Sequence, residues 1–134
     1  MSDLQKLDPA VAELAKGKNF GTLSFQLPSG RIASHVMWVD SDGEHLLINT
    51  EVDRAKYKAM VAHPQVTIAI WKSENPYAYA EVRGRVVGEV RGPEARAHID
   101  ACSERYTGNK YGGEIKSERV IVKVAVERQR HQNL

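Results

Sequence analysis

The stretch G-T-L-S-F-Q-L-P-S-G-R-I-A-S-H-V-M-W-V-D-S-D-G, residues 21–43, contains two alternating runs, each followed by a turn. In Asn19–Leu27 apolar and polar side chains alternate, which is typical of a half-buried strand. Arg31–Asp40 alternates in the same way. Pro28–Gly30 and Ser41–Gly43 carry the small and polar residues that tight turns require. The stretch therefore predicts two consecutive antiparallel strands.

Further strand and helix patterns fill the rest of the chain. Strands are predicted at Glu44–Thr50, Val66–Lys72, Tyr77–Val90 and Glu118–Glu127. The first of these completes a three-stranded meander, and the second is expected to be central because both of its faces are apolar. Gly84 and Gly88 predict bends within the long third run. Helices are predicted from Asp8-Pro9 to Gly17, over Asp53–His63, and from Gly92-Pro93 to about Tyr106.

These patterns add up to a mainly β fold with some α structure: about six antiparallel strands and two or three flanking helices. An open sheet of this size would leave bare edges, so we expect it to close into a small barrel. One domain is expected over residues 1–134, since the chain has room for a single core. The two apolar faces of Val66–Trp71 exceed what one small barrel needs, which favours a homodimer.

Composition excludes several classes of protein. With 42% hydrophobic and 27% charged residues, the chain is a globular protein and not a disordered one. No apolar run approaches the ~18 residues of a membrane span. The polar, acidic start M-S-D-L-Q-K-L-D-P has no secretory core, so a cytoplasmic location is expected. The net charge of +2 is too small to indicate nucleic-acid binding.

Residues for direct catalysis or metal binding are not evident in the sequence. The serines lack a G-x-S-x-G context, and the five histidines are scattered without a zinc-binding spacing. The one cysteine, Cys102, lies in a helical pattern and is interpreted as a partly buried structural thiol. No catalytic residue and no metal ligand is therefore predicted. If the protein is an enzyme, a bound cofactor is expected to carry the chemistry.

The segment N-T-E-V-D-R-A-K-Y-K, residues 49–58, is the strongest candidate for a binding site. Asn49 and Thr50 end a strand, and cationic side chains follow where a helix is predicted to begin: Arg54, Lys56 and Lys58. Polar donors, free backbone N–H groups and cations in a small volume suit a phosphate or another anion. The alternative is a solvated helix face with ordinary surface charges.

Aromatic residues suggest what such an anion belongs to. Trp38, Trp71, Tyr77 and Tyr79 lie on predicted strands, and a planar heterocycle could lie against them. They could equally be core or dimer-interface residues. Tyr106, Lys110 and Tyr111 precede or flank glycines and could form a mobile lid, or simply a solvated loop. The residues alone thus predict a small β-barrel that binds a phosphorylated, planar cofactor.

The order of these motifs resembles a known family. F-G-T-L-S-F, S-G-R-I-A-S-H-V-M-W-V-D-S-D-G, L-L-I-N-T-E-V-D-R-A-K-Y-K-A-M and H-P-Q-V-T-I-A-I are similar to the FMN-binding split barrels of the pyridoxamine 5'-phosphate oxidase-like superfamily. The later Y-A-E-V-R-G-R-V, R-Y-T-G-N-K-Y and S-E-R-V-I-V-K-V look most like its actinobacterial branch, whose reductases use the deazaflavin coenzyme F420. The resemblance extends over residues 10–127.

The resemblance implies a homodimeric split barrel with cofactor sites at the subunit interface. The cofactor phosphate would meet the end of the third strand and the following helix, at Thr50, Arg54 and Lys56, with Asn49 beside them. The ring would lie along the second strand, largely against backbone groups, at His35, Val36, Met37 and Trp38. Side chains of the partner subunit could reach the ring or its tail, with Tyr79, Tyr106 and Lys110 as the candidates.

The implied activity is transfer of a hydride from reduced F420 to a small unsaturated organic acceptor. Two alternatives remain on the same fold: an FMN-dependent oxidoreductase or oxidase, and a protein that binds the cofactor without catalysis. The chain ends in E-R-Q-R-H-Q-N-L and lacks the Arg- and Trp-bearing segment of a true pyridoxamine phosphate oxidase. That difference argues against oxidation of vitamin B6.

Overall fold

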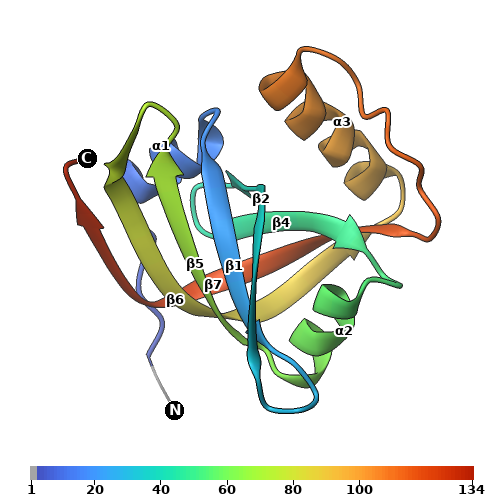
Figure 1. Ribbon diagram of the computed structural model, residues 1–134, viewed down its shortest axis with the longest axis horizontal. Helices are drawn as coiled ribbons and strands as arrows, with labels where there is room; N and C mark the ends of the chain where they lie inside the picture. The colour runs from blue at the N-terminus through green and yellow to red at the C-terminus, as the bar shows by residue number, and fades with distance from the viewer. Residues whose placement is uncertain (1–2) are drawn as a thin grey trace.

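Seven antiparallel strands form one sheet in the computed structural model, which describes residues 3–134 (Figure 1). The strands are β1 (Phe20–Gln26), β2 (Ile32–Trp38), β3 (Asp40–Ser41), β4 (Leu46–Glu51), β5 (Gln65–Lys72), β6 (Asn75–Arg91) and β7 (Arg119–Gln132). Their order in the sheet is β2-β1-β5-β6-β7-β4-β3. Three helices accompany them: α1 (Pro9–Lys16), α2 (Ala55–Ala62) and α3 (Pro93–Thr107). The mainly β class with three helices is confirmed.

The predicted strand count and the predicted meander are both wrong. The chain forms seven strands where six were expected, because the run Arg31–Asp40 ends early and Asp40–Ser41 forms a separate short strand. β1 and β2 pair as predicted, but β4 pairs with β7 and β3 instead of β2. The alternation of the sequence identifies strands, whereas partner choice depends on contacts far along the chain.

The sheet curls so that its first and last strands are joined through the chain itself. β2 occupies one end of the sheet, and after Val39 it continues directly into β3, which occupies the other end. Asp40 and Ser41 pair with Leu47 and Leu46 of β4. β2 itself pairs only with β1. No backbone hydrogen bonds of the sheet therefore join β2 to β4. The result is a split barrel that is closed where β3 pairs with β4 and open between β2 and β4.

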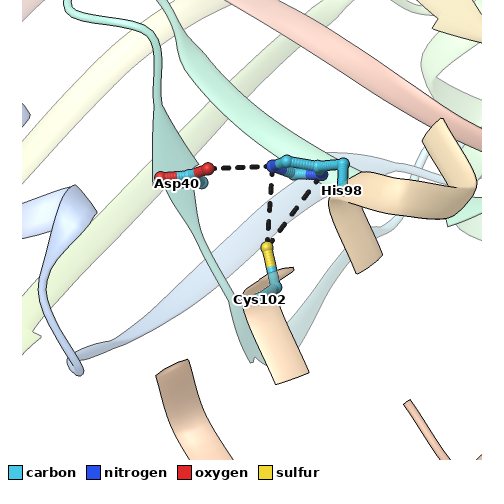
Figure 2. Close-up of side chains that lie close together, drawn as sticks. All are labelled: Asp40, His98 and Cys102. Atoms are coloured by element: carbon cyan, nitrogen blue, oxygen red, sulfur yellow. Dashed lines mark hydrogen bonds and ion pairs between the residues drawn. The ribbon is translucent and has the colours of Figure 1, made fainter. Parts of the chain in front are cut away.

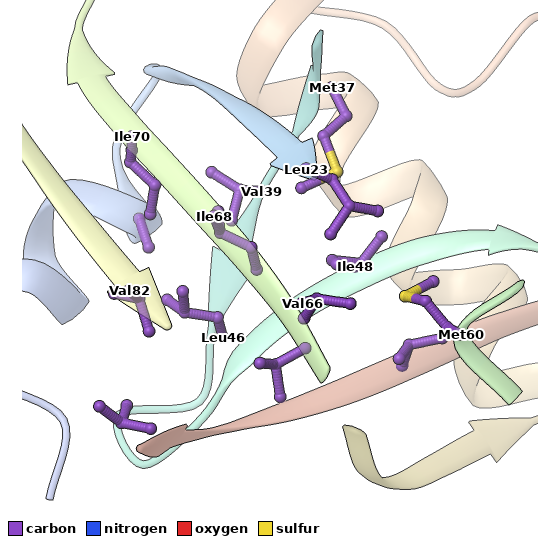
Figure 3. Close-up of a cluster of buried hydrophobic side chains, with 14 of the residues drawn as sticks. Leu23, Met37, Val39, Leu46, Ile48, Met60, Val66, Ile68, Ile70 and Val82 are labelled. Atoms are coloured by element: carbon purple, nitrogen blue, oxygen red, sulfur yellow. The ribbon is translucent and has the colours of Figure 1, made fainter. Parts of the chain in front are cut away.

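The inside of the barrel is filled by aliphatic side chains from several strands (Figure 3). Leu23 of β1, Leu46 of β4 and Ile68 of β5 are completely inaccessible to solvent. β5 lies between β1 and β6, as its apolar composition predicted. Each of these side chains contributes about 1.5–3 kcal/mol relative to leaving it exposed. The core therefore fixes the curvature of the sheet.

Gly84 shows why the long strand β6 bends. The pairing of β6 with β7 shifts register between Arg83 and Gly84 and again between Val86 and Gly88, where the bends were predicted. A Cβ atom on Gly84 would lie 2.2 Å from the carbonyl oxygen of Ala125. Only glycine allows the two strands to approach so closely.

The first helix begins at the predicted cap, and the third ends at a glycine that the sequence analysis did not identify as a cap. The carboxylate of Asp8 accepts a hydrogen bond from the backbone N–H of Ala10 at 2.8 Å and so caps α1. α3 ends at Gly108, which adopts a left-handed φ of 83°. In Figure 1, β4 runs between α2 and α3. Within residues 3–134, no helix combines the length and the apolar character needed to cross a bilayer.

Candidate functional site

A cavity of about 310 Å³ lies at the split of the barrel. Its walls come from the end of β2, from β4, from the start of α2 and from α3. The cavity therefore brings together both ends of the curled sheet. Seven residues predicted to bind a cofactor line it: Val36, Met37, Trp38, Asn49, Thr50, Arg54 and Lys56.

Three cationic side chains meet in the cavity wall: Arg54, Lys56 and Arg119. Burial lowers the pKa of Lys56, and the charges of Arg54 and Arg119 lower it further. Burial also lowers the pKa of Arg119, although the nearby charge of Glu51 opposes that change. Like charges in one wall repel, as the lowered pKa of Lys56 indicates, and a bound anion would relieve the repulsion.

Glu51 orients two of these cations and anchors a loop. Its side chain is 4% exposed, and Oε2 lies 3.0 Å from Arg54 Nη2 and 3.3 Å from Arg119 Nη1. Oε1 accepts hydrogen bonds from the backbone N–H groups of Lys116 and Ser117, each at 2.8 Å. Burial raises the pKa of Glu51, but hydrogen bonds from Ser117, Arg54 and Lys116 lower it to about 2. The carboxylate is therefore charged at neutral pH and holds the two guanidinium groups in place.

The hydroxyl group of Thr50 is buried in the same cavity wall without a partner. Thr50 is 1% exposed, and its Oγ1 atom forms no hydrogen bond to any group of residues 3–134. A buried hydroxyl left in this state costs about 1–3 kcal/mol. The adjacent helix α2 begins after Arg54 with no side chain capping its N-terminus. A ligand oxygen placed here would satisfy donors that the chain itself leaves free.

The amide of Asn49 is committed to bonds within the chain. Its Nδ2 atom donates to the carbonyl oxygen of Ala95 at 2.9 Å and lies 3.0 Å from His98 Nδ1. Its Oδ1 atom accepts from Arg119 Nε at 2.9 Å. Asn49 thus ties α3 to β4 and β7 and orients Arg119. A direct contact between Asn49 and a cofactor stays a prediction.

Stacked aromatic rings support the β2 side of the cavity. The rings of Trp38 and Tyr106 are parallel within 4°, with centroids 5.2 Å apart. The Tyr106 hydroxyl donates to the backbone carbonyl of Asn19 and accepts from the backbone N–H of Val39. Tyr111 closes the wall, with its ring edge-on to Trp38 and beneath the guanidinium of Arg119. Tyr106 is therefore placed behind Trp38 and does not itself line the cavity.

Three other predicted residues also lie away from the cavity wall: His35, Tyr79 and Lys110. His35 is exposed at the β2 edge and contacts the ring of Phe25. Tyr79 pairs with Trp71 in the β5–β6 ladder, and Lys110 is exposed after α3. Their contact with a cofactor, directly or from a partner subunit, stays a prediction.

Asp40, His98 and Cys102 form a cluster of ionisable groups that the sequence did not predict, and two of them, His98 and Cys102, line the cavity (Figure 2). His98 Nε2 lies 2.8 Å from Asp40 Oδ2, and Arg105 Nη2 lies 3.2 Å from the other oxygen. Burial lowers the pKa of His98, but its hydrogen bonds to Asp40 and Cys102 raise it to about 9. Burial raises the pKa of Asp40, but its hydrogen bonds to His98 and Ser41 and the charges of Arg105 and His98 together outweigh that effect, so the net change is downward.

Some of these residues lie close together in the chain, and others come from remote segments. His98 and Cys102 are four residues apart on a predicted helix, a spacing that places two side chains on one face, although the two residues were not predicted to act together. Asp40 and Arg119 come from remote parts of the chain, and only the curling of the sheet brings them to the cavity. Arg119 looked like an ordinary charge at the start of a strand.

Comparison with known proteins gives both a family and a fold. A family profile described as pyridoxamine 5'-phosphate oxidase matches residues 7–133. A search of curated protein sequences returned no significant match. A solved structure named F420 reductase is 28% identical to the chain, with a TM-score of 0.79; the alignment covers 92% of this chain and 98% of that one.

Two further structures share the fold at lower identity. A conserved hypothetical protein from Mycobacterium tuberculosis is 24% identical, with a TM-score of 0.68 and coverage of 98% of this chain and 87% of that one. A pyridoxamine 5'-phosphate oxidase-related, FMN binding protein from Nostoc punctiforme is 14% identical, with a TM-score of 0.66. Its alignment covers 93% of this chain and 84% of that protein.

Proposed function

Because the chain belongs to the pyridoxamine 5'-phosphate oxidase family, we propose that it binds coenzyme F420 in the cavity at the split of the barrel and reduces a small unsaturated organic acceptor. A flavin-type cofactor agrees with the family and with the F420- and FMN-binding proteins that share the fold. The choice of F420 over FMN rests on the similarity to the structure named F420 reductase and on the motifs of the sequence.

The unpartnered hydroxyl of Thr50 is the observation that carries the proposal. Thr50 lines the cavity together with Arg54 and Lys56, and no group of residues 3–134 satisfies its buried hydroxyl. A phosphoryl group is an anion with several acceptor oxygens, so it would accept from Thr50 and offset the repulsion between the cations. The residues present therefore fit the phosphate of the cofactor.

The rest of the cavity is suited to hold a planar ring and exclude water. Val36, Met37 and Trp38 supply an apolar wall, and the stack with Tyr106 fixes the orientation of Trp38. When bound, reduced F420 supplies the hydride, so the protein needs no acid–base pair for that step. Its task is to hold ring and acceptor about 3–3.5 Å apart.

A second copy of the chain is proposed to complete the site. β2 is an edge strand, and its Ile32 and Val36 side chains are each 68% exposed. Val36 also lines the cavity, so a partner that covers this edge would lie beside the cofactor. By the family resemblance, Tyr79 or Lys110 of one subunit is proposed to reach the site of the other; neither lines the cavity of its own subunit.

The test is titration of the apo-protein with F420 and with FMN, followed by native mass measurement of the bound species. We expect F420 to bind more tightly, two cofactors per dimer, and reduced F420 to be oxidised when an enone is added. Preference for FMN with turnover would favour the FMN-dependent alternative. Tight F420 binding without turnover by any acceptor would favour a binding protein. Failure to bind either cofactor would refute the proposal.

A further inference from the structure

Helix α3 presents a thiol and an imidazole to the cavity, one turn apart (Figure 2). Cys102 Sγ lies 3.6 Å from His98 Nε2 and 3.7 Å from Arg105 Nη2. Asp40 holds both neighbours, with one carboxylate oxygen on His98 and the other on Arg105. The sulfur is therefore flanked by an imidazole and a guanidinium whose positions are fixed by one carboxylate.

A metal ion fits this cluster poorly. Donor atoms of Asp40, His98 and Cys102 lie within 4.8 Å of one another, which is close enough for a shared ion. Arg105, however, already places its positive charge against two of the three ligands, Asp40 and Cys102. A divalent cation would have to displace that guanidinium or accept its repulsion. The arrangement is better suited to stabilise negative charge that develops on sulfur.

Access to Cys102 is from the cavity. The residue is 3% exposed, yet it lines the cavity wall together with His98 and Ile99. Thr50, whose buried hydroxyl has no partner within residues 3–134, lines the same cavity and independently indicates that a ligand enters it. Cys102 is the only cysteine in the chain, so its chemistry cannot be diverted into an internal disulfide.

We propose that Cys102 is a nucleophilic site for soft electrophiles that enter the cavity, in particular α,β-unsaturated carbonyl compounds. Sulfur adds to such compounds at the β-carbon, and cationic neighbours favour the attack. The site is distinct from hydride transfer, because it needs neither cofactor nor reductant. A covalent bond to Cys102 would hold an electrophile in the cavity.

The addition is balanced without an oxidant. The Sγ–H bond breaks, and its proton passes to water. A sulfur electron pair forms the bond to the β-carbon, the C=C π electrons form a π bond between the α-carbon and the carbonyl carbon, and the C=O π electrons move onto oxygen to give an enolate. The α-carbon then takes a proton from water. One S–H bond and one C=C π bond are thus replaced by one C–S bond and one C–H bond. During this sequence His98 and Arg105 remain in place and stabilise the charge on sulfur.

The experiment measures the rate of reaction of the intact protein with N-ethylmaleimide, by mass spectrometry, with glutathione as the reference thiol. We expect a single adduct, mapped to Cys102, that forms faster than the glutathione adduct and in proportion to maleimide concentration. The substitution His98→Gln should slow the reaction by about tenfold or more, since it removes one of two charges beside sulfur. Cys102→Ser should abolish it.

His45 provides a matched control, because it forms a similar pair with Asp42, at 3.0 Å, and does not line the cavity. His45→Gln should leave the rate unchanged. A rate independent of maleimide concentration would mean that Cys102 reacts only after unfolding and would overturn the proposal. An unchanged rate in a folded His98→Gln variant would also overturn it. Tight zinc binding that is lost in both His98→Gln and Cys102→Ser would assign the cluster to a metal instead.

Discussion

The core of the barrel and the cavity at its split differ in how well their buried groups are satisfied. In the core, Leu23, Leu46 and Ile68 are fully buried and apolar, so each buried group finds the environment it prefers. In the cavity, an unpartnered hydroxyl and mutually repelling cations share a small volume. The comparison teaches that the apolar core supplies the stability of the fold. The cavity holds groups that gain free energy only when a ligand arrives.

The largest effect is expected at Glu51, whose carboxylate holds two cations of the cavity wall. Glu51→Gln would leave Arg119, which is 6% exposed, without its ion-pair partner. Removal of one partner from a buried pair typically costs about 3–5 kcal/mol. We therefore expect the free energy of unfolding to fall by that amount in urea titrations. A loss below 1 kcal/mol would mean that Glu51 is not needed to hold the cations.

The same carboxylate predicts a pH dependence. The pKa of Glu51 is lowered from 4.5 to about 2 in the folded chain, so its contribution is complete above pH 4.5. This part of the stability should disappear as the pH falls from 4.5 to about 2. In Glu51→Gln the free energy of unfolding should lack this part of its decrease at acidic pH. Parallel urea titrations of both proteins across this window provide the measurement.

A core substitution should affect stability while sparing the cavity. Ile68→Ala removes buried methyl and methylene groups from the centre of the sheet, and we expect a loss of about 3 kcal/mol in the free energy of unfolding. Because Ile68 does not line the cavity, cofactor affinity measured below the unfolding transition should be unchanged. A large loss of affinity would show that the two regions are coupled.

Lys56→Ala should have the reverse pattern. If Lys56 meets the phosphoryl group, its loss should weaken cofactor binding by about 1–3 kcal/mol. Stability should change little, because the charge of Lys56 is opposed by Arg54 and Arg119 in the empty cavity. Lys58→Ala is the matched control, since Lys58 is exposed on the same helix and does not line the cavity. Equal dissociation constants for the two variants would remove Lys56 from the site.

Thr50→Val should change stability and cofactor affinity in opposite directions, each by a small amount. Valine has a similar shape and no hydroxyl, so the variant should be more stable than the wild type by about 1 kcal/mol. Its cofactor affinity should nevertheless decrease, since one donor to the phosphate is gone. Thermal unfolding and titration of the same preparation test both parts. A variant that is less stable would indicate that the Thr50 hydroxyl has a partner after all.

The sequence predicted the strands, the bends at Gly84 and Gly88, and the family, because each depends on local alternation or on motif order. It did not predict β3 or the pairing of β4 with β7, since these depend on how distant segments pack. The cavity was anticipated from residues close together in the chain, such as Thr50 and Lys56. Arg119 and Asp40 could not be found that way, because only the closed sheet brings them near.

The most direct test of the central claim is a crystal structure of the protein with bound F420. The phosphoryl oxygens should lie within hydrogen-bond distance of Thr50 Oγ1 and of the Lys56 and Arg54 side chains, in the cavity at the split of the barrel. A structure in which that corner is empty and the cofactor lies elsewhere would contradict the account.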